Sequence, residues 1–480
     1  MSLGVANNIA LGGLRFTSQG TRVVAENLAN ADIEGYGLRS TLATGTISGG
    51  ASTVARNGAV IRDVDPVLLA AVRSADTVRQ SAQIETAALS ELEQAYGLPG
   101  ETGSLNDLFS RLDANLHQAA TTPDSPAALQ AVAQDAERIA AKFNAIGQHI
   151  QAMRQQADTA VETDIATLNT QLERVASLNK DIQRQTLLGG TPFALMDERE
   201  RVISDIATLL PVSEIPRDNN RVMLVTARGE ILVDLDAAEF GFTATPGIAA
   251  DDTRSSGAVS SISLNGRELG LGDRTLAGGK LGANLAVRDT IAPQAQSDLD
   301  RLAMDLLTRF AGPDADTSLA AGELGLFTLT SGTSFPADPT GAAQALRITP
   351  MIDPADSSSL WRLRSGLNAA MPGPSVDPAN LSRMIDALSD PRTLGPGLPA
   401  LSMAENISET LSRVATKRLG AESALAYAQA SYTAKQETLA SRGVDTDAQM
   451  QDLLELERAY AANARVLTTI DDMLRQLLEI

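Results

Sequence analysis

An unbroken apolar repeat runs along the end of the chain, and only a long helix can bring its members onto one face. The repeat alternates spacings of three and four residues through Leu453, Leu456, Tyr460, Asn463, Leu467, Ile470, Leu474 and Leu477. Thr446 and Gln449 precede it in the Ser/Thr-x-x-Glu/Gln relation of a capping box, which predicts that a helix begins there. A helix from Thr446 to Ile480 would be roughly 50 Å long, so it needs a partner along its whole length.

A second apolar row beside this repeat indicates that the helix has two partners. The row consists of Leu454, Val466, Met473 and Leu478. The N-terminus offers one partner, a helix predicted from Leu3 to Ala31, in which Ile9, Phe16 and Val23 lie seven residues apart and Leu28 follows. The second row would stay exposed in a monomer, and such a surface is typical of a subunit that assembles. The alternative is that one large fold buries both rows.

Helical and β-like segments alternate between the two ends of the chain. Residues 39–61 are rich in Gly, Ser and Thr and predict an extended or weakly structured connector. From Pro66 to Leu188 good helix formers dominate, with breaks at Gly97–Gly100 and Thr121–Pro126, so about three helices are expected. Within them a heptad pattern runs from Val161 to Ile182, which fits either a coiled coil or the core-facing side of a bundle.

Short β-branched runs separated by turn residues replace the helical pattern after Pro211. The turns are Asn219-Asn220, Arg228-Gly229 and Asn265-Gly266, and they predict a small antiparallel β region up to about Gly279. Helical spacing returns from Asn284 to Phe310. The region 311–399 has many Pro and Gly residues with short apolar runs such as Leu326–Leu329 and Ala345–Ile348, which favours an irregular or β-containing insert.

The predicted fold class is mainly α with β inserts, and it divides the chain into four parts. Residues 1–60 and 430–480 form a terminal domain of paired, coiled-coil-like helices. Residues 61–210, 284–310 and 400–429 form a helical-bundle rod, residues 211–283 a small antiparallel β domain, and residues 311–399 the insert. The length of 480 residues agrees with several domains, since a single core stops growing well below that size.

Composition and motif searches argue against several classes of function. The net charge of −20 opposes binding to nucleic acid or anionic membranes, and no apolar run is long enough to span a membrane. There is no cysteine, the N-terminus lacks the features of a cleaved signal peptide, and neither His117 nor His149 belongs to a metal-ligand motif. Gly278-Gly279-Lys280 lacks the spacing of a phosphate-binding loop, and Asp234 and Asp236 lack that of a calcium loop. We therefore expect no enzyme activity, metal or cofactor.

Four segments resemble the family of flagellar hook-associated protein 1. Asn27, Asn30, Gly35 and Tyr36 match the Asn-x-x-Asn-x-x-Thr-Pro-Gly-Tyr signature near the start of flagellar rod, hook and hook-associated proteins, with Ile33-Glu34 in place of Thr-Pro. Leu454 to Leu467 is similar to the closing helix of these proteins. Leu195 to Glu200 and Gly278 to Gly282, the latter followed by Val287-Arg288-Asp289, are similar to the segments that flank the β domain in this family.

The resemblance implies a structural subunit of the bacterial flagellum at the hook–filament junction. Its implied partners are further copies of itself in a ring, hook protein, hook-associated protein 3 and a cytoplasmic export chaperone. It would be extracellular, exported without a cleaved signal, and its termini would fold on assembly. The implied interface is the set Ile9, Phe16, Val23, Asn27, Leu28, Asn30, Gly35 and Tyr36 with the eight residues of the C-terminal repeat. Another flagellar axial protein, or a cell-wall hydrolase carried on a flagellar scaffold, are the alternatives.

Overall fold

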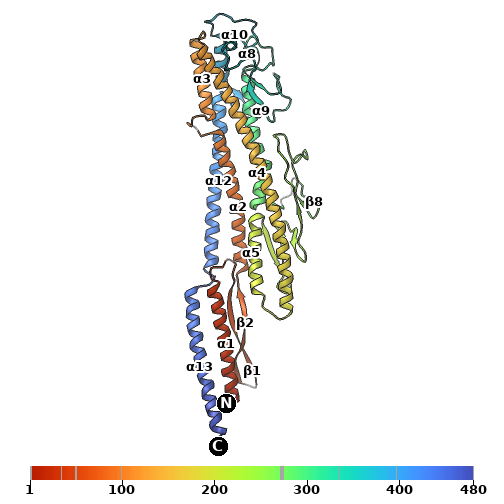
Figure 1. Ribbon diagram of the computed structural model, residues 1–480, viewed down its shortest axis with the longest axis vertical. Coiled ribbons are helices and arrows are strands. Elements are labelled where there is room, and N and C mark those ends of the chain that lie inside the picture. Colours follow the sequence, from red (N-terminus) through yellow and green to blue (C-terminus); the bar gives the residue numbers. More distant parts are fainter. Residues whose placement is uncertain are drawn as a thin grey trace.

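Helices make up most of this elongated molecule, and the start of the first helix and the end of the last lie at the same end of it (Figure 1). The computed structural model describes residues 3–33, 35–48, 51–98, 100–270, 275–332, 334–395 and 397–478. The long helices are α1 (Leu3–Ala29), α2 (Pro66–Tyr96), α3 (Leu105–Thr121), α4 (Pro126–Leu187), α5 (Phe193–Leu209), α7 (Ala292–Arg309), α12 (Met403–Ala440) and α13 (Thr446–Leu478). The shorter ones are α6 (Gly279–Ala286), α8 (Gly312–Ala315), α9 (Ala342–Ala345), α10 (Trp361–Ser365), α11 (Ala379–Ser389) and a π-helical turn η1 (Val287–Ile291). The predicted fold class is confirmed.

The terminal section consists of α1, α13 and a β-hairpin (Figure 1). The hairpin corrects the prediction of a simple connector at 39–61. Strands β1 (Leu38–Ser48) and β2 (Ala51–Asp63) pair antiparallel, beginning with Leu38 opposite Asp63. An isolated two-stranded ribbon is marginally stable in water, and here α1 packs against both strands and supplies the missing layer.

The rod is built on α2, α3, α4 and α12, and its helix boundaries follow from local capping. The predicted breaks at Gly97–Gly100 and Thr121–Pro126 are confirmed, since α2 ends at Tyr96 and α3 at Thr121. The side chain of Asp65 accepts hydrogen bonds from the first amides of α2. Ser402 and Glu405 form a complete capping box at the start of α12. Each cap satisfies amides that have no partner inside the helix.

The heptad pattern of α4 is a core-facing stripe of the rod. All seven of its positions are buried, and most of them pack in one cluster with α5, α6 and the first β-sheet. Asn179, the polar member, donates to the carbonyl of Val222 at 2.7 Å and accepts from its amide at 3.2 Å. The helix therefore holds a β-strand at this position, where a coiled coil would hold a second helix.

Two three-stranded antiparallel sheets form the described part of the β region. The strands are β3 (Val212–Pro216), β4 (Val222–Thr226) and β5 (Ile231–Val233) in one, and β6 (Phe240–Gly241), β7 (Ser263–Leu264) and β8 (Arg267–Glu268) in the other. Asn219, Asn220 and Asn265 adopt positive φ angles of 57°, 59° and 50°. Asn tolerates this conformation better than most residues, so the turns predicted at these positions are confirmed.

Short elements of residues 311–399 pack around the end of the rod opposite the termini (Figure 1). Strands β9 (Phe327–Leu329) and β10 (Leu346–Ile348) pair antiparallel where apolar runs were noted in the sequence, and β11 (Arg392–Thr393) pairs with β12 (Ala400–Leu401). The rings of Phe310 and Phe327 meet edge to face with centroids 5.2 Å apart. This part of the chain thus shares one apolar core with the rod.

Candidate assembly surface and its anchor to the rod

The two terminal helices pack against each other within a single chain and leave part of the predicted interface open. Val23 and Ile470 are buried, whereas most of the other apolar positions are only half-buried. The half-buried positions are Ile9, Phe16, Leu28, Leu453, Leu456 and Leu467, together with the polar Asn463. Tyr460 and Leu474 remain 49% and 42% exposed, and the side chain of Leu477 lies outside the described residues. The pairing of α1 with α13 therefore needs no second copy, but it does not cover the whole repeat.

Two glycines let the terminal helices approach closely. A Cβ atom on Gly13 would lie 2.7 Å from Nδ2 of Asn463, and one on Gly20 would lie 2.9 Å from a methyl group of Leu456. Glycine inside a helix costs about 1 kcal/mol relative to alanine, and these two lie seven residues apart, in step with Asn27. The seven-residue spacing of these glycines indicates a helix contact, and a pattern based on apolar residues alone does not include it.

Asn27 is the polar centre of the terminal section. Its side chain is buried, with 1% exposure, and its Nδ2 donates to the carbonyl of Arg39 and to Oε1 of Gln449, both at 2.8 Å. Its Oδ1 accepts from the hydroxyl of Tyr36 at 2.8 Å and from the amide of Arg39 at 3.1 Å. One side chain thus joins α1, β1 and the first turn of α13. Asn30, in contrast, donates to the carbonyl of Glu26 in its own helix at 2.6 Å.

This use of Gln449 corrects the predicted capping box at the start of α13. The cap is Asp445, whose Oδ1 accepts from the amides of Asp447 and Ala448 at 3.0 and 3.1 Å. Thr446 is the first residue of the helix. The side chain of Gln449 turns to Asn27 because that buried amide requires an acceptor. A contact between residues 422 positions apart therefore decides the local capping pattern.

Asp197 on α5 anchors the terminal section to the rod. Its carboxylate accepts from the amide of Gly37 at 3.1 Å, from Arg39 at 3.2 Å and from Nε of Arg62 at 2.6 Å. The guanidinium of Arg39 also lies 4.8 Å from the centre of the Tyr36 ring. Burial raises the pKa of the Tyr36 phenol, so this group stays protonated and donates to Asn27. The segment around Tyr36 and the segment around Asp197, both of which resemble flagellar proteins in sequence, are therefore in contact at this anchor.

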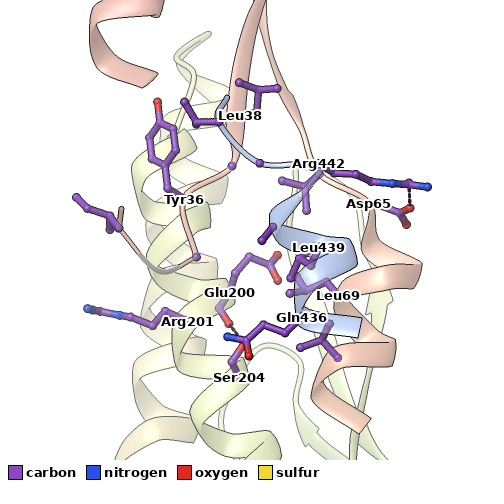
Figure 2. A pocket seen from close by; sticks show the side chains of 18 of the residues that line it. Tyr36, Leu38, Asp65, Leu69, Glu200, Arg201, Ser204, Gln436, Leu439 and Arg442 are labelled. Carbon is purple, nitrogen blue, oxygen red and sulfur yellow. Dashed lines mark hydrogen bonds and ion pairs between the residues drawn. The ribbon is translucent and has the colours of Figure 1, made fainter. Parts of the chain in front are cut away.

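A cavity of 1180 Å³ lies beside this anchor, where the terminal section joins the rod (Figure 2). Leu69 of α2, Glu200 and Ser204 of α5, and Gln436 and Leu439 of α12 point toward it. An ion pair between Arg442 and Asp65 lies at its edge. The terminal section and the rod thus meet through discrete polar contacts around a hollow.

A metal site and a membrane span were both sought among the described residues. Within the described ranges no group of three or more His, Asp or Glu residues could hold a metal ion. His117 and His149 each lie beside one carboxylate, that of Asp113 and that of Glu91. Nor does any helix in the described part of the chain have the length and apolar character to cross a membrane.

Replacing Asn27 by alanine is expected to lower the stability of the terminal section by about 2 to 3 kcal/mol, because four hydrogen bonds of a buried group disappear and their partners lose their pairing. Hydrogen exchange should accelerate in β1 and in the first turn of α13. Asn30→Ala is the matched control, since the bond from Asn30 to the carbonyl of Glu26 stays within α1. Equal exchange rates in the two variants would contradict the central role of Asn27.

Two family models match this chain, and both describe flagellar proteins. Residues 89–325 match the model of the flagellar hook-associated protein FlgK helical domain, which corresponds to most of the rod and the β region. Residues 435–480 match the model of the flagellar basal body rod FlgEFG protein C-terminal region, which includes α13. The second model describes proteins of the flagellar basal body rod, so the first model is the more specific of the two.

Individual relatives carry the same description. Flagellar hook-associated protein 1 of Salmonella typhimurium is 25% identical over 321 residues, which cover 64% of this chain and 57% of that protein. The protein of that name from Bacillus subtilis is 22% identical over 414 residues, covering 82% and 79%. The match to the Salmonella relative thus spans little more than half of its length. The structure of the flagellar hook junction protein FlgK from Burkholderia pseudomallei superposes with a TM-score of 0.46 at 21% identity, over 54% of this chain and 46% of that one.

Proposed function

Because this chain belongs to the family of flagellar hook-associated protein 1, we propose that it is a structural subunit of the bacterial flagellum that joins the hook to the filament. The observation that carries the proposal is the face of α13 that α1 leaves uncovered. Val466 and Met473 are 47% and 49% exposed on one flank of the row that packs on α1, and Leu454 is 49% exposed on the other flank, whereas the side chain of Leu478 lies outside the described residues. Apolar rows of this kind mark contact sites between proteins.

The terminal section is the proposed axial part of the subunit. In the predicted division of the chain it comprises residues 1–60 and 430–480, which adds the end of α12 to α1, α13 and the hairpin. The rod, the β region and the insert at 311–399 extend away from it. Residues 435–480 match a model that describes proteins of the flagellar basal body rod. This match supports a common mode of contact along the flagellar axis. The sixteen residues predicted as the assembly interface belong to this section. Ring formation buries their remaining exposed surface and drives incorporation.

The proposed partners follow from this position. Copies of the chain form a ring, hook protein contacts one side of the ring, and hook-associated protein 3 contacts the other. A cytoplasmic export chaperone covers the C-terminal segment before export, which proceeds without a cleaved signal peptide to the outside of the cell. Burial of an otherwise exposed apolar row is a physical reason for such a chaperone.

Deletion of residues 447–480 tests this function. The rod should still fold, because the two buried apolar clusters of the described chain contain no residue of α13. Cells that carry the deletion are expected to make hooks without filaments and to release flagellin into the medium. Leu419→Ser, at an exposed apolar position of α12, is the control and should leave filaments intact. Normal filaments in the deletion strain would refute the proposal.

A further inference from the structure

Helix α5 holds the chain on both sides of the point where the terminal section passes into the rod. Strand β2 ends and α2 begins within residues 63–66. Just before this crossing, Nε of Arg62 donates to Asp197 of α5 at 2.6 Å. Two turns into α2, Nη2 of Arg73 donates to the carboxylate of Glu200 on α5 at 2.7 Å. The stretch from Arg62 to Arg73 is therefore clamped to α5 at both ends.

Arg73 also holds the β region. Its Nη1 donates to the carboxylate of Glu214 on β3, and its Nε donates to Oγ of Ser204 on α5 at 2.9 Å. The side chain of Arg73 is only 6% exposed, so its charge depends on these partners in place of water. Burial raises the pKa of the Glu214 carboxyl, the charge of Glu200 raises it further, and Arg73 opposes the rise. One buried guanidinium thus joins three elements, α2, α5 and β3.

Open space lies on two sides of these contacts. The cavity of 1180 Å³ borders them toward the terminal section, and a second cavity of 680 Å³ is lined by residues of both α2 and β3. Arg62, Arg73 and Glu200 line both cavities. Side chains that border open space are fixed less by packing than those in a close-packed core. Their ionic partners therefore determine where they lie, and they have room to move when a partner is lost.

We infer that this clamp couples the anchor of the terminal section at Asp197 to the attachment of β3 at Glu214. Releasing Arg62 from Asp197 lets the first two turns of α2 shift on α5, and Arg73 then loses its fixed position between α5 and β3. Loss of the charge of Glu214 acts in the reverse direction, because coupling between two sites is reciprocal. The coupling runs through contiguous contacts within one chain, so it does not depend on the proposed function. A neighbouring protein that displaces the terminal section thereby also loosens the β region.

Hydrogen exchange in the full-length chain tests the coupling. Asp197→Asn removes the charge that holds Arg62, and it is expected to accelerate exchange in residues 212–216 of β3 about tenfold. Glu214→Gln should accelerate exchange in residues 37–39 by a similar factor. In the double variant the two effects should combine to less than their product, as expected for groups in one network. Exchange in the buried part of α4 should stay unchanged, which separates a local release from a general loss of stability.

Two carboxylates close to these elements provide matched controls. Asp205 is exposed on α5, eight residues beyond Asp197, and the side chain of Glu230 in the β region is 42% exposed. Asp205→Asn should leave residues 212–216 unchanged, and Glu230→Gln should leave residues 37–39 unchanged. The coupling is refuted if Asp197→Asn accelerates exchange in the hairpin alone, if the effects in the double variant multiply, or if α4 loses protection to the same degree as β3. It is equally refuted if either control variant reproduces the effect.

Discussion

Replacing Arg288 by methionine is expected to lower the free energy of unfolding of the rod by about 3 to 5 kcal/mol. Arg288 has no exposed side-chain surface, and its Nη1 donates to Oδ1 of Asp158 at 2.6 Å. Asp158 is equally buried, so the substitution removes the guanidinium that pairs directly with its desolvated carboxylate. Breaking a buried pair costs far more than the pair contributes, because the remaining charge stays desolvated. Urea unfolding, followed by circular dichroism, measures the effect.

The control for this experiment is Arg301→Met on α7. Arg301 pairs with Asp298 at 3.2 Å, but its side chain is 44% exposed. Removal of such a surface pair is expected to change stability by about 0.5 kcal/mol or less. If the two variants lose similar amounts of stability, the buried pair does not have the role assigned to it here.

The position of Arg288 explains why the effect should reach beyond one contact. Its backbone carbonyl, in the π-helical turn η1, accepts from Nε of Arg154, which also donates to the carbonyls of Ala249 and Asp252. The carboxylate of Asp158 accepts from the amide of Thr245 at 2.6 Å. The two arginines and Asp158 thus fasten the loop of the β region to α4. Hydrogen exchange in residues 244–260 should therefore accelerate in Arg288→Met as well.

Helices and turns were predictable wherever the signal is local. The breaks around Gly97 and Pro126 and the Asn turns of the β region depend on backbone preferences of a few residues, and the structure has them where the sequence indicated. The hairpin at 38–63 was not predictable in this way. Its strands contain only scattered β-branched residues, which give a weak local signal. Their packing is completed by α1, a separate element, and the pattern of the strands themselves does not record that contact.

The candidate site was predicted in part, for a similar reason. Periodicity identified the facing rows of α1 and α13, because apolar spacing alone defines a helix face. It did not identify Gly13 and Gly20, which act by lacking a side chain. Nor did it identify the contact of Asn27 with Gln449 or that of Asp197 with Arg62, because hydrogen bonds across more than a hundred residues leave no local pattern. The resemblance to flagellar proteins drew attention to those two segments, and the structure supplies their contacts.

The glycine-rich segment before α6 has a structural explanation in the approach of two backbones. Gly278 and Gly279 adopt φ angles of 107° and 64°. A Cβ atom on Gly279 would lie 2.5 Å from the carbonyl oxygen of Leu209, and one on Gly282 would lie 2.5 Å from that of Leu276. Both obstacles are backbone atoms, which cannot rotate away as a side chain can. Side chains are thus excluded where the chain returns from the β region to the rod.

Gly279→Ala is therefore expected to destabilise the rod by about 3 kcal/mol or more, since backbone strain at a positive φ adds to the steric overlap. Gly420→Ala should have the opposite sign. Gly420 lies inside α12, and a Cβ there would meet no atom within 4 Å. That substitution should stabilise the helix by up to about 1 kcal/mol, because alanine has the higher helix propensity. Thermal unfolding of both variants measures the difference, and a Gly279→Ala protein as stable as the parent chain would show that the two backbones can separate without cost.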